Sequence, residues 1–169
     1  MEIERKFLID TLPDLSGAKE VWKIEQAYLA DKPTLRIRKK NDEYILTYKN
    51  RQRSDQTGEE TTATVNEETE IPIPRDIYEH LMQKKTGHVV KKSRYIFVLD
   101  EDHKIELDVF EGRLKGLVMA EVEFKDVKDA NAFVPPAWFG REVSDVKGYS
   151  NKSLSKLDRY EPGRGCASA

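Results

Sequence analysis

Apolar and polar residues alternate along most of this chain, in short runs separated by turn-forming residues. Alternation with a period of two predicts β-strands that present one apolar face and one polar face. About eight such strands with only a few helices predict an antiparallel α+β fold or a β-barrel. The expected strands span residues 2–9, 21–29, 34–40, 43–50, 61–73, 89–100, 104–110 and 117–125.

The remaining segments predict helices and loops. Ile77, Leu81 and Met82 recur at helical spacing between Pro74 and Gly87, which indicates a helix with a defined start and stop. Further along, two prolines end a second helical pattern. The predicted helices span 75–86, 126–133 and 150–157, with a turn or short helix at 11–17, a long connecting loop at 51–60 and a short strand near 142–143.

The polar faces of the predicted strands carry ionisable residues in pairs. In the first strand Glu2, Glu4 and Lys6 share one face, opposite Ile3 and Phe7. A sheet with one face in water explains the alternation, but solvated faces normally mix in serine, threonine and amide residues. The pairing recurs as Arg36 with Arg38, Glu68 with Glu70, Lys92 with Arg94, Glu106 with Asp108, and Glu121 with Glu123.

A closed barrel that turns its polar face inward accounts for both the alternation and the pairing. We therefore predict a closed antiparallel β-barrel with a charged interior, whose apolar exterior is covered by the two longer helices. Buried charges are costly unless they are paired or neutralised by bound ions. The interior is expected to be hydrated, internally salt-bridged and suited to a charged ligand.

The overall composition restricts the partners. The chain has 169 residues and a formal charge of −2, so a polyanion site requires a local concentration of lysine and arginine. We expect one domain with no nucleic-acid or membrane partner, because no apolar run approaches the ~20 residues that span a bilayer. The charged first strand predicts no signal peptide. The single cysteine, Cys166, cannot form an internal disulfide, so a cytoplasmic location is expected.

The residues of the predicted inner face indicate a ligand. Its carboxylates are hard oxygen ligands of the kind that Mg²⁺ and Mn²⁺ prefer, and we expect one or two such ions. Its lysines and arginines match phosphate oxygens. A polyphosphate with its metal fits this face, whereas the common glycine-rich nucleotide loops and hydrolase motifs are absent from the sequence. His80, His88 and His103 are scattered and are expected to be surface residues rather than zinc ligands.

The ordered set of charged pairs resembles one protein family. Glu2-x-Glu4-x-Lys6 is similar to the ExExK signature of CYTH-domain proteins in the triphosphate tunnel metalloenzyme superfamily. The similarity runs from residue 1 to about Leu157, which implies a CYTH domain over 1–157 and leaves 158–169 as a tail that is expected to be flexible. The later elements follow the family's order: Arg36-x-Arg38, Lys49 within Leu-Thr-Tyr-Lys, Glu68-x-Glu70, Lys92-x-Arg94-Tyr95, Glu106-x-Asp108 and Glu121-x-Glu123-Phe124.

The resemblance implies an eight-stranded antiparallel tunnel that binds a triphosphate with a divalent metal. Glu2, Glu4 and Glu123 would hold the catalytic metal, with Glu121 or Asp108 nearby. The remaining implied residues are Glu68 and Glu70, which would bind a second metal or orient water, and a phosphate clamp of Lys6, Arg36, Arg38, Lys49, Lys92 and Arg94.

Some of these positions have structural alternatives. Lys91 competes with Lys92 for the inward position, and Glu106 could serve only to pair with a neighbouring arginine. Three further cations, Arg113, Lys125 and Lys147, are expected to be exposed to solvent.

Three classes of function fit the inner face. Hydrolysis of inorganic tripolyphosphate to phosphate and pyrophosphate is favoured by the resemblance, with thiamine triphosphate hydrolysis as a variant. A class IV type adenylate cyclase is the second class, although no adenine pocket is evident beside residues such as Tyr28 and Tyr95. A non-catalytic polyphosphate- or nucleotide-binding module is the third, and it would not need so many carboxylates. No particular oligomeric state is predicted.

Overall fold

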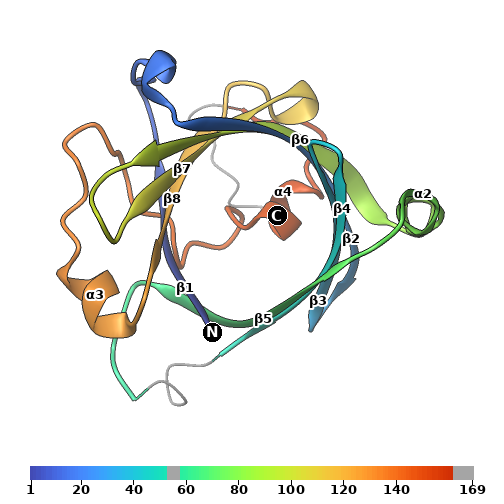
Figure 1. The fold of residues 1–169 in the computed structure, drawn as a ribbon, viewed down its shortest axis with the longest axis horizontal. Coiled ribbons are helices and arrows are strands. Elements are labelled where there is room, and N and C mark those ends of the chain that lie inside the picture. The colour runs from blue at the N-terminus through green and yellow to red at the C-terminus, as the bar shows by residue number, and fades with distance from the viewer. Residues whose placement is uncertain (53–57, 162–169) are drawn as a thin grey trace.

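Eight antiparallel strands close into a barrel in the computed structural model, which describes residues 1–52 and 58–161 (Figure 1). The order around the ring is β1-β5-β4-β3-β2-β6-β7-β8, so the predicted closed antiparallel barrel is confirmed. Each described strand pairs with a neighbour on both sides, so the sheet closes on itself. The strands are β1 (Glu2–Leu8), β2 (Glu20–Asp31), β3 (Thr34–Lys40), β4 (Glu43–Arg51), β5 (Thr64–Pro72), β6 (Thr86–Val98), β7 (Lys104–Phe110) and β8 (Val118–Phe124).

Two helices pack against the outside of the barrel, as predicted. Helix α2 (Arg75–Met82) places the buried ring of Tyr78 against Ala27 and Ile37 of β2 and β3. Helix α3 (Val127–Ala132) covers β1 and β8. Its N-terminus is capped by Asp126, which accepts the backbone N–H of Asp129 at 2.7 Å. The short elements are η1 (Leu15–Gly17), η2 (Gly112–Leu114) and α4 (Asn151–Leu154).

The apolar core lies between the barrel wall and the α3 side of the molecule. Outward-facing residues such as Ile3, Leu107 and Val122 are almost completely buried there. Arg5 also points outward, and its Nη1 donates to the carbonyl oxygens of Ala130 at 2.9 Å and Phe133 at 3.0 Å. Arg5 thereby satisfies carbonyl groups at the C-terminal end of α3 and holds the helix on the wall.

Several element boundaries differ from the sequence predictions. The helix predicted over 75–86 ends at Met82, and β6 already begins at Thr86. Gly87 is therefore not a helix stop. It has φ 71°, and an added Cβ would lie 2.8 Å from the carbonyl oxygen of Ser155, so glycine permits this close approach of the C-terminal segment. The strand predicted over 61–73 begins only at Thr64, and the predicted loop 51–60 lies partly outside the described residues.

One end of the lumen is apolar, which corrects the expectation of a polar inner face along its whole length. On β1, β6, β7 and β8, the inward-facing residues next to the charged pairs are apolar. They pack against side chains of the C-terminal segment, residues 141–160. The contacting residues are Leu8, Val90, Phe110 and Met119 of the strands and Val143, Tyr149 and Leu154 of the segment.

The C-terminal segment closes this end of the barrel. Leu8 donates its backbone N–H to Arg141 at 2.8 Å, beside the position along β1 where the pairing with β5 has ended. On the opposite side, Lys156 Nζ lies 3.1 Å from Asp31 Oδ2 at the turn between β2 and β3. Seen down the barrel, α4 lies within the ring of strands (Figure 1). The charged half of the lumen therefore opens at the other end, where β1 begins and β8 ends.

The chain continues along the barrel after residue 157. Tyr160 donates its backbone N–H to Arg113 at 2.9 Å, and His88 Nε2 lies 3.3 Å from Asp158 Oδ1. The last part of the predicted tail, residues 162–169, lies outside the described residues. No helix within the described ranges has the length and apolar character needed to cross a membrane.

Candidate active site

A group of carboxylates lines the open half of the lumen. This carboxylate cluster consists of Glu2, Glu4, Glu68, Glu106 and Glu123, and Glu4 is the direct cross-strand partner of Glu123. Lys49 lies among them: its Nζ is 2.5 Å from Glu2 Oε1, 3.8 Å from Glu4 Oε1 and 3.5 Å from Glu68 Oε2. The strand register therefore brings together acids that are far apart in the sequence.

The carboxylate cluster carries more negative charge than Lys49 neutralises. Burial raises the pKa of Glu4, and Lys49 only partly opposes this shift. Burial, together with repulsion from Glu2, Glu106 and Glu4, raises the pKa of Glu123 to about 7. Crowded carboxylates of this kind are stabilised by an added cation.

The donor set fits a hard divalent cation. Two carboxylate oxygens, Glu68 Oε2 and Glu121 Oε1, are buried and accept no hydrogen bond, although a lysine Nζ lies 3.5 Å from the first and 3.4 Å from the second. Within the part of the chain that the structure describes, no three carboxylate, histidine or cysteine groups already stand in the arrangement of metal ligands. Lys49 occupies the space between Glu2, Glu4 and Glu68, so its ammonium group marks where positive charge is favourable.

A second group of residues forms a buried ion-pair network deeper in the lumen. Arg94 donates from Nε to Asp108 Oδ1 at 2.7 Å, from Nη2 to Asp108 Oδ2 at 2.8 Å and from Nη1 to Glu106 Oε2 at 2.7 Å. Lys92 Nζ lies 2.7 Å from Asp108 Oδ2. Burial raises the pKa of Asp108, but Arg94 and Lys92 outweigh it and hold this pKa below its usual value. The pKa of Lys92 is lowered to about 7, chiefly by burial, although Asp108 counteracts the shift.

Glu121 belongs to the same network. Its carboxylate lies 3.4 Å from Lys6 Nζ and 3.5 Å from Arg94 Nη2. Burial alone would raise the pKa of Glu121, but Lys6 and Arg94 hold it well below the usual range. The two cations therefore favour the ionised form of Glu121.

The opposite wall of the lumen carries positive charge that is weakly neutralised. Arg36 and Arg38 lie on β3, across the ring from β8. Arg36 donates from Nη2 to Thr47 Oγ1 at 3.2 Å and is 3.8 Å from Glu70, while its Nε has no partner. Burial and then the charges of Arg36 and Arg94 lower the pKa of Arg38 to about 10. In this arginine wall, Arg36 and Arg38, the only ion pair among the described residues is the long one between Arg36 and Glu70, so the wall favours an added anion.

The structure places the predicted site residues on a common lumen. Lys92 points inward and is completely buried, whereas Lys91 is exposed, and Glu106 does pair with an arginine. Both oxygens of Asp108 are engaged by Arg94 and Lys92, so the geometry gives its predicted metal-ligand role no support. Three other cations, Arg113, Lys125 and Lys147, are exposed as expected.

Neutral polar residues in the lumen were not predicted from the sequence. Gln26 is completely buried and accepts from Arg38, and Asn151 of the C-terminal segment accepts from Lys92 Nζ at 3.1 Å. Gln26 lies on the same alternating face of β2 as Ile24 and Tyr28, so the period-two pattern could have indicated that Gln26 faces the lumen. No sequence pattern could have placed Asn151 in the lumen, because its segment has no strand alternation.

His103 is not the simple surface residue that was expected. Its ring is 13% exposed and lies between Asp100 Oδ2 at 2.9 Å and Asp129 Oδ1 at 3.0 Å. Hydrogen bonding to Asp100 raises the pKa of His103, with a further contribution from Asp129. The histidine links the β6–β7 turn to α3 and lies outside the lumen, so its role is structural.

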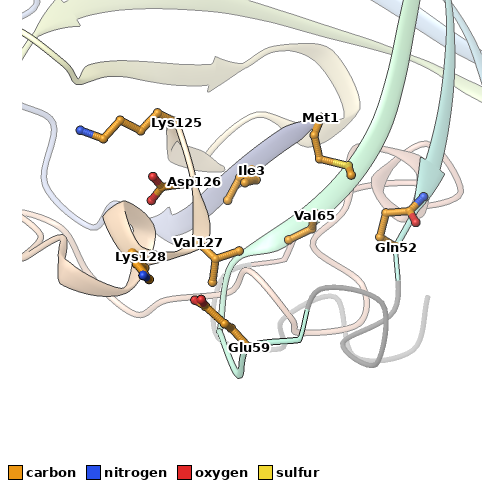
Figure 2. A pocket seen from close by; sticks show the side chains of 9 residues that line it. All are labelled: Met1, Ile3, Gln52, Glu59, Val65, Lys125, Asp126, Val127 and Lys128. Atoms are coloured by element: carbon orange, nitrogen blue, oxygen red, sulfur yellow. The ribbon is translucent and has the colours of Figure 1, made fainter.

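The cavity shown in Figure 2 is separate from the lumen. It has a volume of about 470 Å³ and lies beside the start of α3. Ile3 and Val65, which line it, belong to the outward face of the barrel wall and to the apolar core. None of the arginines of the lumen lines this cavity. The candidate active site is therefore the lumen itself.

The fold and the lumen define a class of antiparallel tunnel proteins whose ionisable side chains face inward. The chain belongs to the CYTH domain family, whose model matches residues 1–160. The resemblance inferred from the charged pairs is thus confirmed.

Characterised relatives span nearly the whole chain. An inorganic triphosphatase of Nitrosomonas europaea is 39% identical over 157 residues, which cover 91% of this chain and 96% of that protein. An inorganic triphosphatase of Acetivibrio thermocellus is 35% identical over 158 residues, with 92% and 93% coverage. A crystal structure of an inorganic triphosphatase superposes with a TM-score of 0.66 at 38% identity, and covers 95% of this chain and 97% of that one.

Proposed function

We propose that this protein is a metal-dependent triphosphatase that hydrolyses inorganic tripolyphosphate to phosphate and pyrophosphate. The observation that carries the proposal is the position of the arginine wall opposite the carboxylate cluster in one closed lumen. One wall favours an added anion and the other favours an added cation, as a polyphosphate with its metal would supply. The two inorganic triphosphatases at 39% and 35% identity support this choice of substrate.

Glu2, Glu4 and Glu123 are proposed to hold the metal, because they lie together in the cluster and each is harder to ionise than an ordinary glutamate. All three have pKa values raised by burial, and Glu123 is repelled by both of the others. Mg²⁺ or Mn²⁺ bound there would neutralise phosphoryl oxygens and lower the pKa of a coordinated water. Glu68 and Glu70 are proposed to serve a second ion or to orient water. Asp108 is left out of this ligand set because two cations already engage it.

The proposed substrate contacts come from the cations around the ligand set. Arg36 and Arg38 bind and orient the phosphate chain through weakly neutralised guanidinium groups, since Gln26 holds Arg38 and Arg36 has only Glu70 at 3.8 Å. Lys6 stands beside Glu121 on the opposite wall and would approach the same anion. Lys92 lies deeper in the lumen, where Asp108 and Asn151 hold its Nζ. The phosphate-binding role of Lys49 stays a prediction.

A phosphate-release panel tests the proposed function. Purified protein with Mg²⁺ or Mn²⁺ is expected to release phosphate from tripolyphosphate faster than from ATP or thiamine triphosphate. Formation of cyclic AMP from ATP would instead support a cyclase. If no phosphate is released from any of the three substrates, the proposal is wrong. A non-catalytic polyphosphate- or nucleotide-binding module would then be favoured.

Metal binding is expected to weaken as the pH falls below about 7. Glu123 has a pKa of about 7, so at lower pH a proton occupies the carboxylate that a metal requires. Calorimetric titration with Mn²⁺ should give a lower affinity at pH 6 than at pH 8, by up to about tenfold per pH unit. Glu123→Gln should lose both affinity and most of this pH dependence. Equal affinity of the wild type at the two pH values would remove Glu123 from the ligand set.

A further inference from the structure

Arg38 differs from Arg94 in the group that holds its guanidinium. Arg94 is neutralised by Asp108, Glu106 and Glu121. Arg38 is held by an uncharged side chain, since Gln26 Oε1 accepts from Nε at 2.9 Å and from Nη2 at 2.8 Å. Across the described residues, no carboxylate forms an ion pair with Arg38.

Gln26 is fixed in this orientation by its surroundings. It is completely buried and is the direct cross-strand partner of Arg38 in the ladder of β2 with β3. Its Oε1 must face the arginine, because Nε2 donates to the hydroxyl of Tyr28 at 3.1 Å. The pairing of β2 with β6 shifts register directly after Gln26, which indicates a β-bulge. Bulges often re-aim side chains beside functional sites.

We infer that Gln26 is a positioning residue that holds the Arg38 fork with a neutral acceptor and so leaves the charge of Arg38 available to phosphate. A guanidinium has about five N–H donors, and two of those of Arg38 go to Gln26. The remaining donors can contact an anion in the lumen.

A glutamate at the Gln26 position would accept the same two bonds and would neutralise Arg38, as Asp108 neutralises Arg94. The choice of an amide over a carboxylate of equal size is therefore functional. The inference rests on the proposed function, because it takes the ligand to be a phosphate anion.

The test compares Gln26→Glu with the wild type. The variant should unfold at an equal or higher temperature without ligand, because a carboxylate then partners the buried Arg38. Its affinity for pyrophosphate in the presence of Mg²⁺, measured by calorimetry, should fall by about tenfold or more, and the KM for tripolyphosphate should rise similarly. Gln83→Glu, the same change at an exposed position outside the barrel, should leave both the pyrophosphate affinity and the KM unchanged. Unfolding temperature and anion affinity thus move in opposite directions, which a merely structural role would not produce.

A second variant separates charge from orientation. Gln26→Met has similar length but no acceptor, so Arg38 keeps its charge and loses its fixed position. We expect kcat to fall by about tenfold with a smaller change in KM, because misplaced contacts mainly affect the reaction step. Gln26→Glu should show the converse pattern, with KM changed more than kcat.

The outcomes separate this inference from the proposed function. If Gln26→Glu binds pyrophosphate as tightly as the wild type, the inference is wrong even when tripolyphosphate is hydrolysed. If the wild type releases no phosphate but Gln26→Glu still weakens anion binding, the proposed function fails and the inference stands. If the wild type binds neither pyrophosphate nor tripolyphosphate, both fail. Should Gln26→Glu not fold, an unchanged kcat in Gln26→Met would overturn the inference, and a lowered kcat with little change in KM would support it.

Discussion

Replacing Glu4 by glutamine is expected to lower kcat for tripolyphosphate at least ~100-fold. The amide keeps the size of the side chain but removes a carboxylate charge from the centre of the cluster, beside Glu123 and Lys49. The free energy of unfolding should stay equal or rise, because the cluster loses one repelling carboxylate while Glu2 and Glu68 still contact Lys49. Phosphate release with Mg²⁺ or Mn²⁺ measures turnover, and calorimetric titration measures Mn²⁺ binding. We expect Glu4→Gln to weaken both together.

Glu67→Gln is the matched control for Glu4→Gln. Glu67 is the neighbour of Glu68 on β5 but points outward and is exposed. Its replacement removes the same charge from the same wall without reaching the lumen, so activity and metal binding should not change. Activity of Glu4→Gln near the wild-type level would place Glu4 outside the metal site.

Replacing Asp108 by asparagine is expected to destabilise the protein by about 3–5 kcal/mol. Asp108 is completely buried, accepts two hydrogen bonds from Arg94 and lies 2.7 Å from Lys92 Nζ. The amide would leave two buried cations with too little negative charge between them. Urea unfolding of the wild type and the variant measures this difference in free energy.

Asp102→Asn provides the comparison, because Asp102 is exposed in the turn between β6 and β7. Its stability is expected to stay within about 0.5 kcal/mol of the wild type. A different result for Asp108→Asn would support the metal-ligand role that the family resemblance implied for Asp108. In that case Asp108→Asn would be as stable as the wild type and would lose Mn²⁺ binding.

The architecture of the barrel followed from local patterns. Period-two alternation located all eight strands to within a few residues, and repeated charge pairs indicated an inward polar face, which the closed sheet confirms. Errors fell where a tertiary contact overrides a local signal. Gly87 looked like a helix stop, but the close approach of Ser155 explains why glycine is needed there.

The sequence did not predict which side chains form ion pairs with one another inside the site. Asp108 and Glu123 both follow the alternating charged pattern, so the pattern alone does not distinguish them as metal ligands. Only the register sets Arg94 opposite Asp108 and sets Glu4 opposite Glu123. The first carboxylate is thereby neutralised, and the second is left among other acids with a raised pKa. Gln26 carries no charge, so the pattern of charged pairs did not indicate it.

The sequence by itself determined which charged side chains of the strands face the lumen, because the direction of a strand side chain follows its place in the alternation. It also determined the family through the order of the charged pairs. The tertiary structure alone decided which cations remain uncompensated and which end of the barrel is closed. Both depend on contacts between distant segments, such as Lys92 with Asn151, which are 59 residues apart. Strand register and the path of the C-terminal segment set those contacts, and local sequence patterns predict neither of them.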